Sequence, residues 1–202
     1  MSTPLVTPAA RQLWAALRML IVMTAVAGLA YPLAMTGFAQ VVFPDRADGS
    51  VVETGGTPVG SSLIGQSFVG QPEYFQSRPS AAGDGYDPLA SSASNLGPEN
   101  EDLIAAIEDR RQAAADLDGT APDQVAPDAL LASGSGLDPD ISREYAEQQV
   151  ARIARERGLS EVAVRQFVEE NTSGRMLGFL GEPHVNVLLL NLALDEASGQ
   201  AD

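Results

Sequence analysis

The chain has 202 residues, which is enough for one domain with an additional element or for two small domains. It contains no cysteine, so disulfides and thiolate metal sites are excluded, although an oxidising exterior is permitted. After residue 44, ten arginines stand against 27 acidic residues, a net charge of −17 that repels nucleic acid. Solubility is the ordinary purpose of such a surface, and collection of cations is the alternative.

An uncharged segment near the N-terminus, residues 19–43, is long enough to cross a bilayer. It has 25 residues, whereas a membrane helix needs roughly 20. A cleaved signal peptide is the alternative, but its apolar region normally has only about 7 to 15 residues. The segment therefore favours a retained anchor, and Pro32 predicts a kink within it.

The charges that flank this segment predict its orientation. Residues 1–44 carry Arg11 and Arg18 and no acid, and acidic residues begin directly afterwards at Asp45. Because positively charged flanks remain in the cytoplasm, residues 1–18 are predicted to be cytoplasmic. The chain would then be a single-pass protein of the cell membrane with an extracytoplasmic main domain.

Small residues recur on one face of the predicted membrane helix at spacings of three and four. Such a face lets another transmembrane helix approach closely. The predicted packing face for a membrane partner consists of Ala27, Ala30, Ala34 and Gly37. The pattern is weak evidence, because small residues are common in membrane helices.

The first segments after the span combine turn-forming and apolar residues. Residues 44–60 are rich in Gly, Asp, Thr and Pro, which indicates an irregular lead-in. A short apolar cluster then fits a strand: Leu63, Ile64, Phe68 and Val69. Residues 71–100 have a composition typical of disorder. Interleaved apolar residues favour an ordered loop pinned to a core instead: Tyr74, Phe75, Tyr86 and Leu96.

The rest of the chain alternates helical and strand-like patterns. A helix is predicted to open near Pro98, and residues 129–132 could form a strand. Asp138 or Ser142 is predicted to cap a helix that Gly158 ends, and Ser160 starts another. The apolar run 184–194 reads as a buried strand. We therefore predict an α+β fold, with one globular domain over residues 61–197 and a tail over 198–202.

The residue types exclude several kinds of catalysis. Because the chain has no lysine, it has neither a Walker phosphate loop nor the Asp-Lys-Thr-Gly-Thr signature of ion-pumping ATPases. His184 is the single histidine, and no residues at suitable spacing suggest a hydrolase triad or a zinc site around it. Paired acids such as Glu169 and Glu170 fit a solvated helix face. We predict no catalytic residues and no metal site.

The stretch SGSGLDPDIS, residues 133–142, allows two interpretations. A glycine-rich turn before a helix can cradle phosphate through backbone N–H groups. Here, however, Asp138 and Asp140 occupy the place where the phosphate would lie and would repel it. The residues therefore favour a structural turn. On the following helix, a polar face predicted to be exposed could meet a partner or an anion: Gln149, Arg152, Arg155 and Glu156.

Several unusual strings together resemble a known family, the C subunit of the Kdp high-affinity potassium-transporting P-type ATPase of bacteria. They are SLIGQSF from Ser62, YFQSRPSAA from Tyr74, GYDP from Gly85, SNLGPEN from Ser94, SGSGLDPDIS, QVARIARERGL from Gln149 and LGEPHVNVLLLNLALD from Leu180. Together with the N-terminal span, they cover nearly the whole chain.

The resemblance implies a non-catalytic accessory subunit that assists the ATPase. Its partners would be a channel-like potassium-binding subunit and a phosphorylated ATPase subunit, and it would act as a catalytic chaperone that raises the affinity for ATP. No firmly bound cofactor is implied, although ATP could act through the complex. The residues linked to nucleotide by resemblance are Gln149, Arg152, Ser133 and Ser135. The family often has a hydroxyl residue where this chain has Leu131.

The predicted topology and the nucleotide role conflict, because Gln149 would lie outside the cell, where ATP is scarce. We give more weight to the topology. The domain would then cap or stabilise the potassium entrance, and any effect on the affinity for ATP would be transmitted through the complex. Direct ATP binding by the domain stays open. The alternative function is a free-standing, membrane-anchored extracytoplasmic ligand-binding domain.

Overall fold

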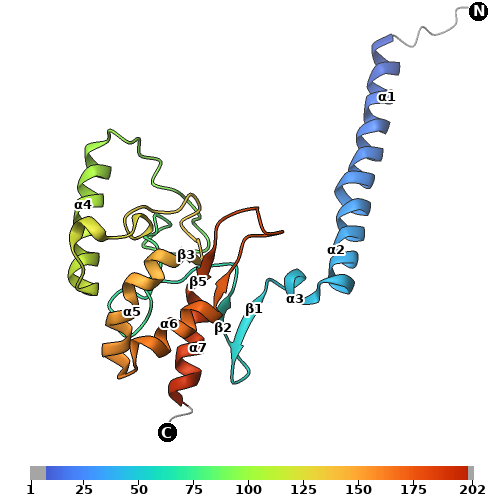
Figure 1. Ribbon diagram of the computed structural model, residues 1–202. Coiled ribbons are helices and arrows are strands. Elements are labelled where there is room, and N and C mark those ends of the chain that lie inside the picture. The colour runs from blue at the N-terminus through green and yellow to red at the C-terminus, as the bar shows by residue number, and fades with distance from the viewer. Residues whose placement is uncertain (1–7, 200–202) are drawn as a thin grey trace, which may run out of the picture. The chain divides into compact units, whose positions relative to one another are not determined.

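The computed structural model describes residues 8–199 and divides into two units (Figure 1). The first unit ends at Val51 and the second begins at Val52. The parts of the predicted cytoplasmic segment and tail that fall on residues 1–7 and 200–202 lie outside the described residues. The chain is α+β, as predicted, with one long apolar helix before a globular domain.

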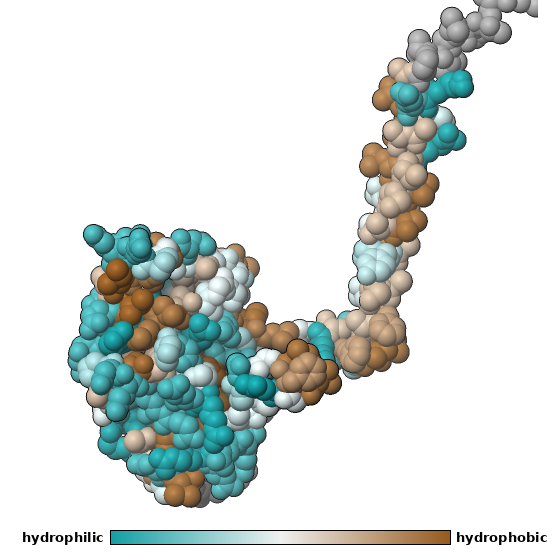
Figure 2. Space-filling model, turned by 45° about the horizontal axis from the view of Figure 1, so that its top comes forward, coloured by the Kyte–Doolittle hydropathy of each residue, from teal (hydrophilic) through white to brown (hydrophobic). Residues whose placement is uncertain are grey.

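The first unit is dominated by a long helical segment made of α1 (Pro8–Met23), η1 (Thr24–Ala30) and α2 (Tyr31–Val42), followed by the short α3 (Pro44–Ala47). Residues Ala9–Val42 have a mean hydropathy of 1.9 over their most apolar window, and none of that window is buried. Apolar side chains therefore dominate the surface of this helix in Figure 2. At 1.5 Å per residue the segment is about 50 Å long, more than the roughly 30 Å of a bilayer's hydrocarbon.

Pro32 coincides with an irregularity in this helix. The N–H of Tyr31 bonds to the carbonyl of Val26, five residues back, so η1 is a π-helical segment. Proline lacks an N–H, and its ring crowds the carbonyl four residues earlier. The π-helical segment directly before Pro32 is therefore the irregularity at the predicted kink, since π turns occur mostly as short insertions within α-helices.

The second unit opens with a hairpin of β1 (Val51–Thr54) and β2 (Thr57–Ser61). Its turn consists of Gly55 and Gly56, with φ of +59° and +79°. Two consecutive positive φ angles match the twist of a tight hairpin, and glycine adopts them without steric cost. The segment predicted to be irregular is therefore an ordered hairpin at this point.

A small antiparallel sheet lies between the helices of the domain. Its strand order is β3 (Asp140–Ser142), β5 (His184–Asn186) and β4 (Thr172–Ser173). Ile141 pairs with Val185, and Val185 pairs with Thr172 on its other side. Two of these central residues, Ile141 and Val185, are fully buried and anchor the sheet in the core.

Four helices complete the domain: α4 (Glu101–Asp118), α5 (Arg143–Arg157), α6 (Glu161–Glu170) and α7 (Val187–Gly199). The predicted caps at Ser142 and Ser160 are confirmed, since each side chain accepts a backbone N–H of the first turn. Gly158 ends α5 in the left-handed conformation, as predicted. Figure 1 shows α5, α6 and α7 gathered around the sheet.

The core joins one face of each helix to the long loop before α4. Its fully buried side chains include Phe75, Ala146, Val150, Ile153, Val164, Val168, Val185, Leu190 and Leu194. The loop over residues 71–100 is ordered, as predicted. Phe75 is its anchor, because Asn191 of α7 accepts the N–H of Phe75 at 2.8 Å and donates to its carbonyl at 3.1 Å. Leu96, predicted to help, is instead largely exposed.

The prediction of a strand over residues 184–194 is wrong beyond its first three residues. β5 ends at Asn186, and α7 begins at Val187. The Asn186 side chain accepts the N–H of Leu189 at 3.1 Å, which caps the new helix. Leucine favours helices, and Val187, Leu190 and Leu194 are buried at helical spacing. The apolar run was too continuous to separate the two structures by pattern.

Two shorter strand predictions are also wrong. Residues 127–129 form a 3₁₀ turn, η3 (Pro127–Ala129), after a similar turn η2 (Pro122–Gln124). Proline fixes φ near −65°, which suits the first position of such turns. The second strand was predicted for the apolar cluster at residues 63–69, but β2 already ends at Ser61. In this cluster Leu63 and Val69 are exposed, whereas Phe68 packs against the core.

Candidate functional site

Gln149 and Arg152 lie on the same side of α5, and both are fully buried. The prediction that they project from an exposed face is therefore wrong. The buried surface of α5 is broad, because the chain segment over residues 72–76 covers the side of the helix that carries these two residues. Arg155, by contrast, is exposed and pairs with the neighbouring Glu156.

The Arg152 guanidinium is fully engaged by groups of this chain. Its Nε donates to Asp118 Oδ1 at 2.8 Å, and this ion pair has side-chain exposures of 0% and 1%. Its Nη1 donates to the carbonyls of Pro72 and Tyr74, and its Nη2 donates to Gln149 Oε1 at 2.7 Å. A buried charge needs such a set of partners to be tolerated.

Gln149 links the same helix to the loop. Its Oε1 accepts the N–H of Gln76 at 2.7 Å, and its Nε2 donates to the carbonyl of Gln76 at 3.3 Å. The carboxylate of Asp118, at the end of α4, also accepts from Gln148 at 2.7 Å. The network therefore joins α4, α5 and residues 72–76 into one structure.

The SGSG segment is a hydrogen-bonded turn, as the residues favoured. Ser133 Oγ accepts the N–H of Gly136 at 2.9 Å, and Ser135 Oγ accepts the N–H of Leu137 at 3.1 Å. Asp138 forms an ion pair of 2.9 Å with Arg78. Because α5 begins only at Arg143, the glycines do not lie at a helix N-terminus. No hydrogen bond within residues 8–199 joins either serine to Gln149 or Arg152.

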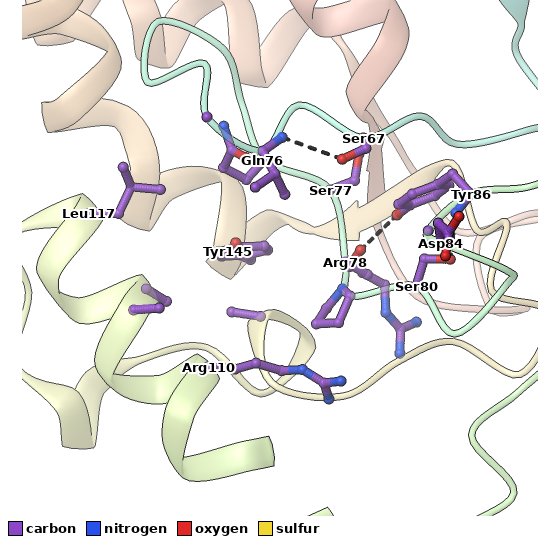
Figure 3. A pocket seen from close by; sticks show the side chains of 17 residues that line it. Ser67, Gln76, Ser77, Arg78, Ser80, Asp84, Tyr86, Arg110, Leu117 and Tyr145 are labelled. Atoms are coloured by element: carbon purple, nitrogen blue, oxygen red, sulfur yellow. Dashed lines mark hydrogen bonds between the residues drawn. The ribbon is translucent and has the colours of Figure 1, made fainter. Parts of the chain in front are cut away.

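A pocket of about 500 Å³ lies between residues 67–86, α4 and the start of α5 (Figure 3). Arg78 and Arg110 enter it from opposite segments. Arg110 donates to the carbonyl of Leu130 at 2.9 Å and forms no ion pair within residues 8–199. The Nε of Arg78 is buried and has no partner in the described part of the chain. Asp84 also lines the pocket, so its wall carries charges of both signs.

Two tyrosines border this pocket. Burial raises the pKa of Tyr86 to about 12, and its hydroxyl donates to the carbonyl of Arg78 at 2.7 Å. Burial also raises the pKa of Tyr145, so both phenols are neutral at physiological pH. They can donate hydrogen bonds, but neither is poised to act as a base.

His184 stands apart from the pocket. Its Nδ1 lies 3.0 Å from the carbonyl of Glu182, and its Nε2 lies 3.7 Å from Asp140. Burial raises the pKa of Asp140, which the charge of His184 partly offsets. Among residues 8–199, no group of three or more metal-ligating side chains is found.

Sequence reasoning missed most of the residues that organise these sites. Asp118 and Asn191 lack any local pattern that marks them as buried, because their partners lie far away in the sequence. Arg78 lies in one of the unusual strings and Arg110 on a helix of ordinary surface composition, and neither pattern indicates a pocket. The four small residues predicted to form a membrane packing face, Ala27, Ala30, Ala34 and Gly37, are all exposed on the helical segment.

Comparison with known proteins assigns the family. Residues 13–196 match the family model of KdpC, described as the K⁺-transporting ATPase, c chain. The chain is 62% identical over 188 residues to the potassium-transporting ATPase KdpC subunit of Kineococcus radiotolerans, covering 93% of this chain and 95% of that protein. It is 56% identical over 185 residues to the KdpC subunit of Sorangium cellulosum, with 90% and 96% covered.

A third relative gives the same result at lower identity. The KdpC subunit of Mycobacterium tuberculosis is 50% identical over 186 residues, which cover 92% of this chain and 98% of that protein. The matched segments include both the apolar helix and the globular domain. The chain therefore belongs to the KdpC family, the C subunits of potassium-transporting ATPases.

Proposed function

We propose that this chain is a non-catalytic accessory subunit of an ATP-driven potassium import complex. It would stabilise the assembly and raise the affinity of the hydrolytic subunit for ATP. The observation that carries the proposal is the family match over residues 13–196. The absence of lysine supports it, because the phosphorylation chemistry of such a pump must then reside in another chain.

The proposed partners are a channel-like potassium-binding subunit and the phosphorylated ATPase subunit of the same complex. The test is affinity purification of the tagged full chain from detergent-solubilised membranes of potassium-starved cells, followed by mass spectrometry. We expect a large multi-span subunit and an ATPase subunit to co-purify. Recovery of this chain alone would contradict the proposal.

We further propose that the chain spans the cell membrane once, with the N-terminus in the cytoplasm and the globular domain outside it. The support is the charge pattern, since Arg11 and Arg18 precede the apolar segment and acidic residues dominate after it. The cysteine-free sequence makes labelling decisive. A membrane-impermeant maleimide should label Val162→Cys in intact spheroplasts, whereas Thr3→Cys should react only after lysis. The reverse pattern would overturn this orientation.

We propose that the effect on ATP is indirect. The side chains of Gln149 and Arg152 are occupied by Gln76, Asp118 and the loop carbonyls, and the hydroxyls of Ser133 and Ser135 are occupied by their own turn. Their link to ATP would then consist in holding the shape of a domain that favours one state of the pump. Coupling of this kind requires only different contacts in the two states.

One observation favours a second candidate function, a membrane-anchored domain that binds its own ligand. The pocket of about 500 Å³ holds Arg110, which forms no ion pair within residues 8–199. A pocket of this volume suits a small ligand. The purification described above separates the two functions, because the second predicts a chain that is isolated without other subunits.

A further inference from the structure

The loop between β4 and β5 exposes a cluster of large apolar side chains. Within five consecutive residues, Met176 is 71% exposed, Leu177 78%, Phe179 70% and Leu180 47%. Figure 1 shows this loop standing away from the body of the domain. We call residues 176–180 the hairpin tip.

The hairpin tip is held in a fixed shape by its own backbone. Met176 and Leu180 pair across the loop, with both N–H···O distances at 2.9 Å. At its base, Arg175 and Glu182 form an ion pair. The apolar side chains are therefore presented on an ordered hairpin, and this ordering limits the conformational entropy lost on binding.

The backbone at the tip is unfavourable for the residue it carries. Leu177 has a φ of +54°, and Gly178 follows with +83°. Two positive angles in a hairpin turn favour Asn-Gly or Gly-Gly, and a bulky branched side chain rarely adopts the first of them. Leu177 is therefore both strained and 78% exposed. A binding role accounts for both.

The charges around the tip favour a protein over a lipid surface. Loops and helices that bind membranes normally combine apolar residues with Lys or Arg that attract anionic lipids. Here Arg175, beside the tip, is paired with Glu182, and residues 45–202 have ten arginines against 27 acids. Protein interfaces, in contrast, are enriched in Phe and Met and place such residues in apolar pockets.

We propose that the hairpin tip docks into an apolar pocket of another subunit of the potassium-transporting complex. This inference rests on the proposed function and adds the contact surface to it. Leu177 and Phe179 would be its anchors, because they are the large side chains nearest the turn. Elsewhere among the described residues of the domain, exposed large apolar side chains are scattered along the chain, apart from the adjacent Leu63 and Ile64.

The first test is site-specific crosslinking in native membranes that contain all subunits. Phe179 is replaced by the photoreactive p-benzoylphenylalanine in the full chain, and Val162, which is 74% exposed on α6, is replaced in the control. We expect a covalent adduct between position 179 and another subunit, absent from position 162. An adduct with lipid only, or no adduct, would overturn the proposal.

The second test separates docking from folding. The double variant Leu177→Ser/Phe179→Ser should weaken retention of the chain on the purified complex about tenfold or more. The matched control, Leu89→Ser/Val162→Ser, alters side chains that are 95% and 74% exposed and should change retention less than about twofold.

A third variant tests docking without lowering the stability of the chain. Leu177→Gly relieves the positive φ, so the melting temperature of the chain should stay the same or rise while retention falls. Unchanged retention in both tip variants, with the wild-type chain still co-purifying, would refute docking but leave the proposed function intact. If the wild-type chain itself recovers no subunit, the proposed function fails.

Discussion

Arg152 of α5 and Asp118 at the end of α4 form an ion pair of 2.8 Å that is shielded from solvent. The same guanidinium holds the carbonyls of Pro72 and Tyr74 and the side chain of Gln149. One charged group therefore fixes two helices and the start of a long loop relative to one another. The domain depends on this pair remaining complete.

Removal of the acidic partner should destabilise the domain strongly. In Asp118→Ala, the Arg152 charge stays buried without a counter-ion, and the loss should be about 3–5 kcal/mol of unfolding free energy. Glu161→Ala is the control, because its 2.8 Å pair with Arg165 is half exposed and should be worth at most about 1 kcal/mol. Urea unfolding of the detergent-solubilised chain measures both. Equal losses would show that burial of the pair is unimportant.

Loss of the two hydrogen bonds between the Asn191 side chain and the backbone of Phe75 should also destabilise the domain. Asn191→Ala leaves the buried N–H and carbonyl of Phe75 without partners, which should cost about 2–4 kcal/mol in total. Gln166→Ala, which loses only an exposed bond to Glu170, should stay within about 0.5 kcal/mol of the wild type. Unfolding midpoints compare the two. A tolerated Asn191→Ala would mean that Phe75 packing alone holds the loop.

The SGSG turn offers two glycines with opposite expectations. Gly136 has a φ of +68°, and an added Cβ would lie 2.6 Å from the carbonyl of Ser92, so Gly136→Ala should cost about 2–4 kcal/mol. Gly134 has open space around an added Cβ and no positive φ, so Gly134→Ala should be within about 0.5 kcal/mol. Thermal unfolding tests the contrast, and two equally mild variants would contradict this description of the turn.

Tyr86 should make stability depend on alkaline pH. Burial raises its pKa from 10.0 in the unfolded chain to about 12 in the folded one, so the folded state holds the proton more tightly. This contribution is complete below pH 10 and is lost as pH rises towards 12. Tyr86→Phe should lose less stability than the wild type over that range, although it also lacks the bond to the Arg78 carbonyl. Identical slopes of unfolding free energy against pH would disprove the assignment.

The sequence predicted those features that depend on local chemistry. The apolar segment around Pro32, the caps at Ser142 and Ser160 and the stop at Gly158 all follow from short patterns, and the structure contains each of them. The strand over 184–194 failed because a continuous apolar run has no period, and the cap at Asn186 alone marks the change to a helix.

The buried polar network could not be predicted for a different reason. Gln149 and Arg152 have the composition of an exposed helix face, and only the loop that packs over them buries them. Their partners lie dozens of residues away in the sequence. The hairpin tip was equally hidden, because apolar residues such as Phe179 and Leu180 suggest a core until the fold leaves them exposed.

We propose that this chain raises the ATP affinity of a potassium-transporting complex. The most direct test is the KM for ATP of the purified complex, prepared without this chain and then with the purified full chain added back, at saturating potassium. The account predicts a high KM without the chain and a fall in KM as the chain is added. A KM that stays the same, although the chain rebinds to the complex, would contradict it.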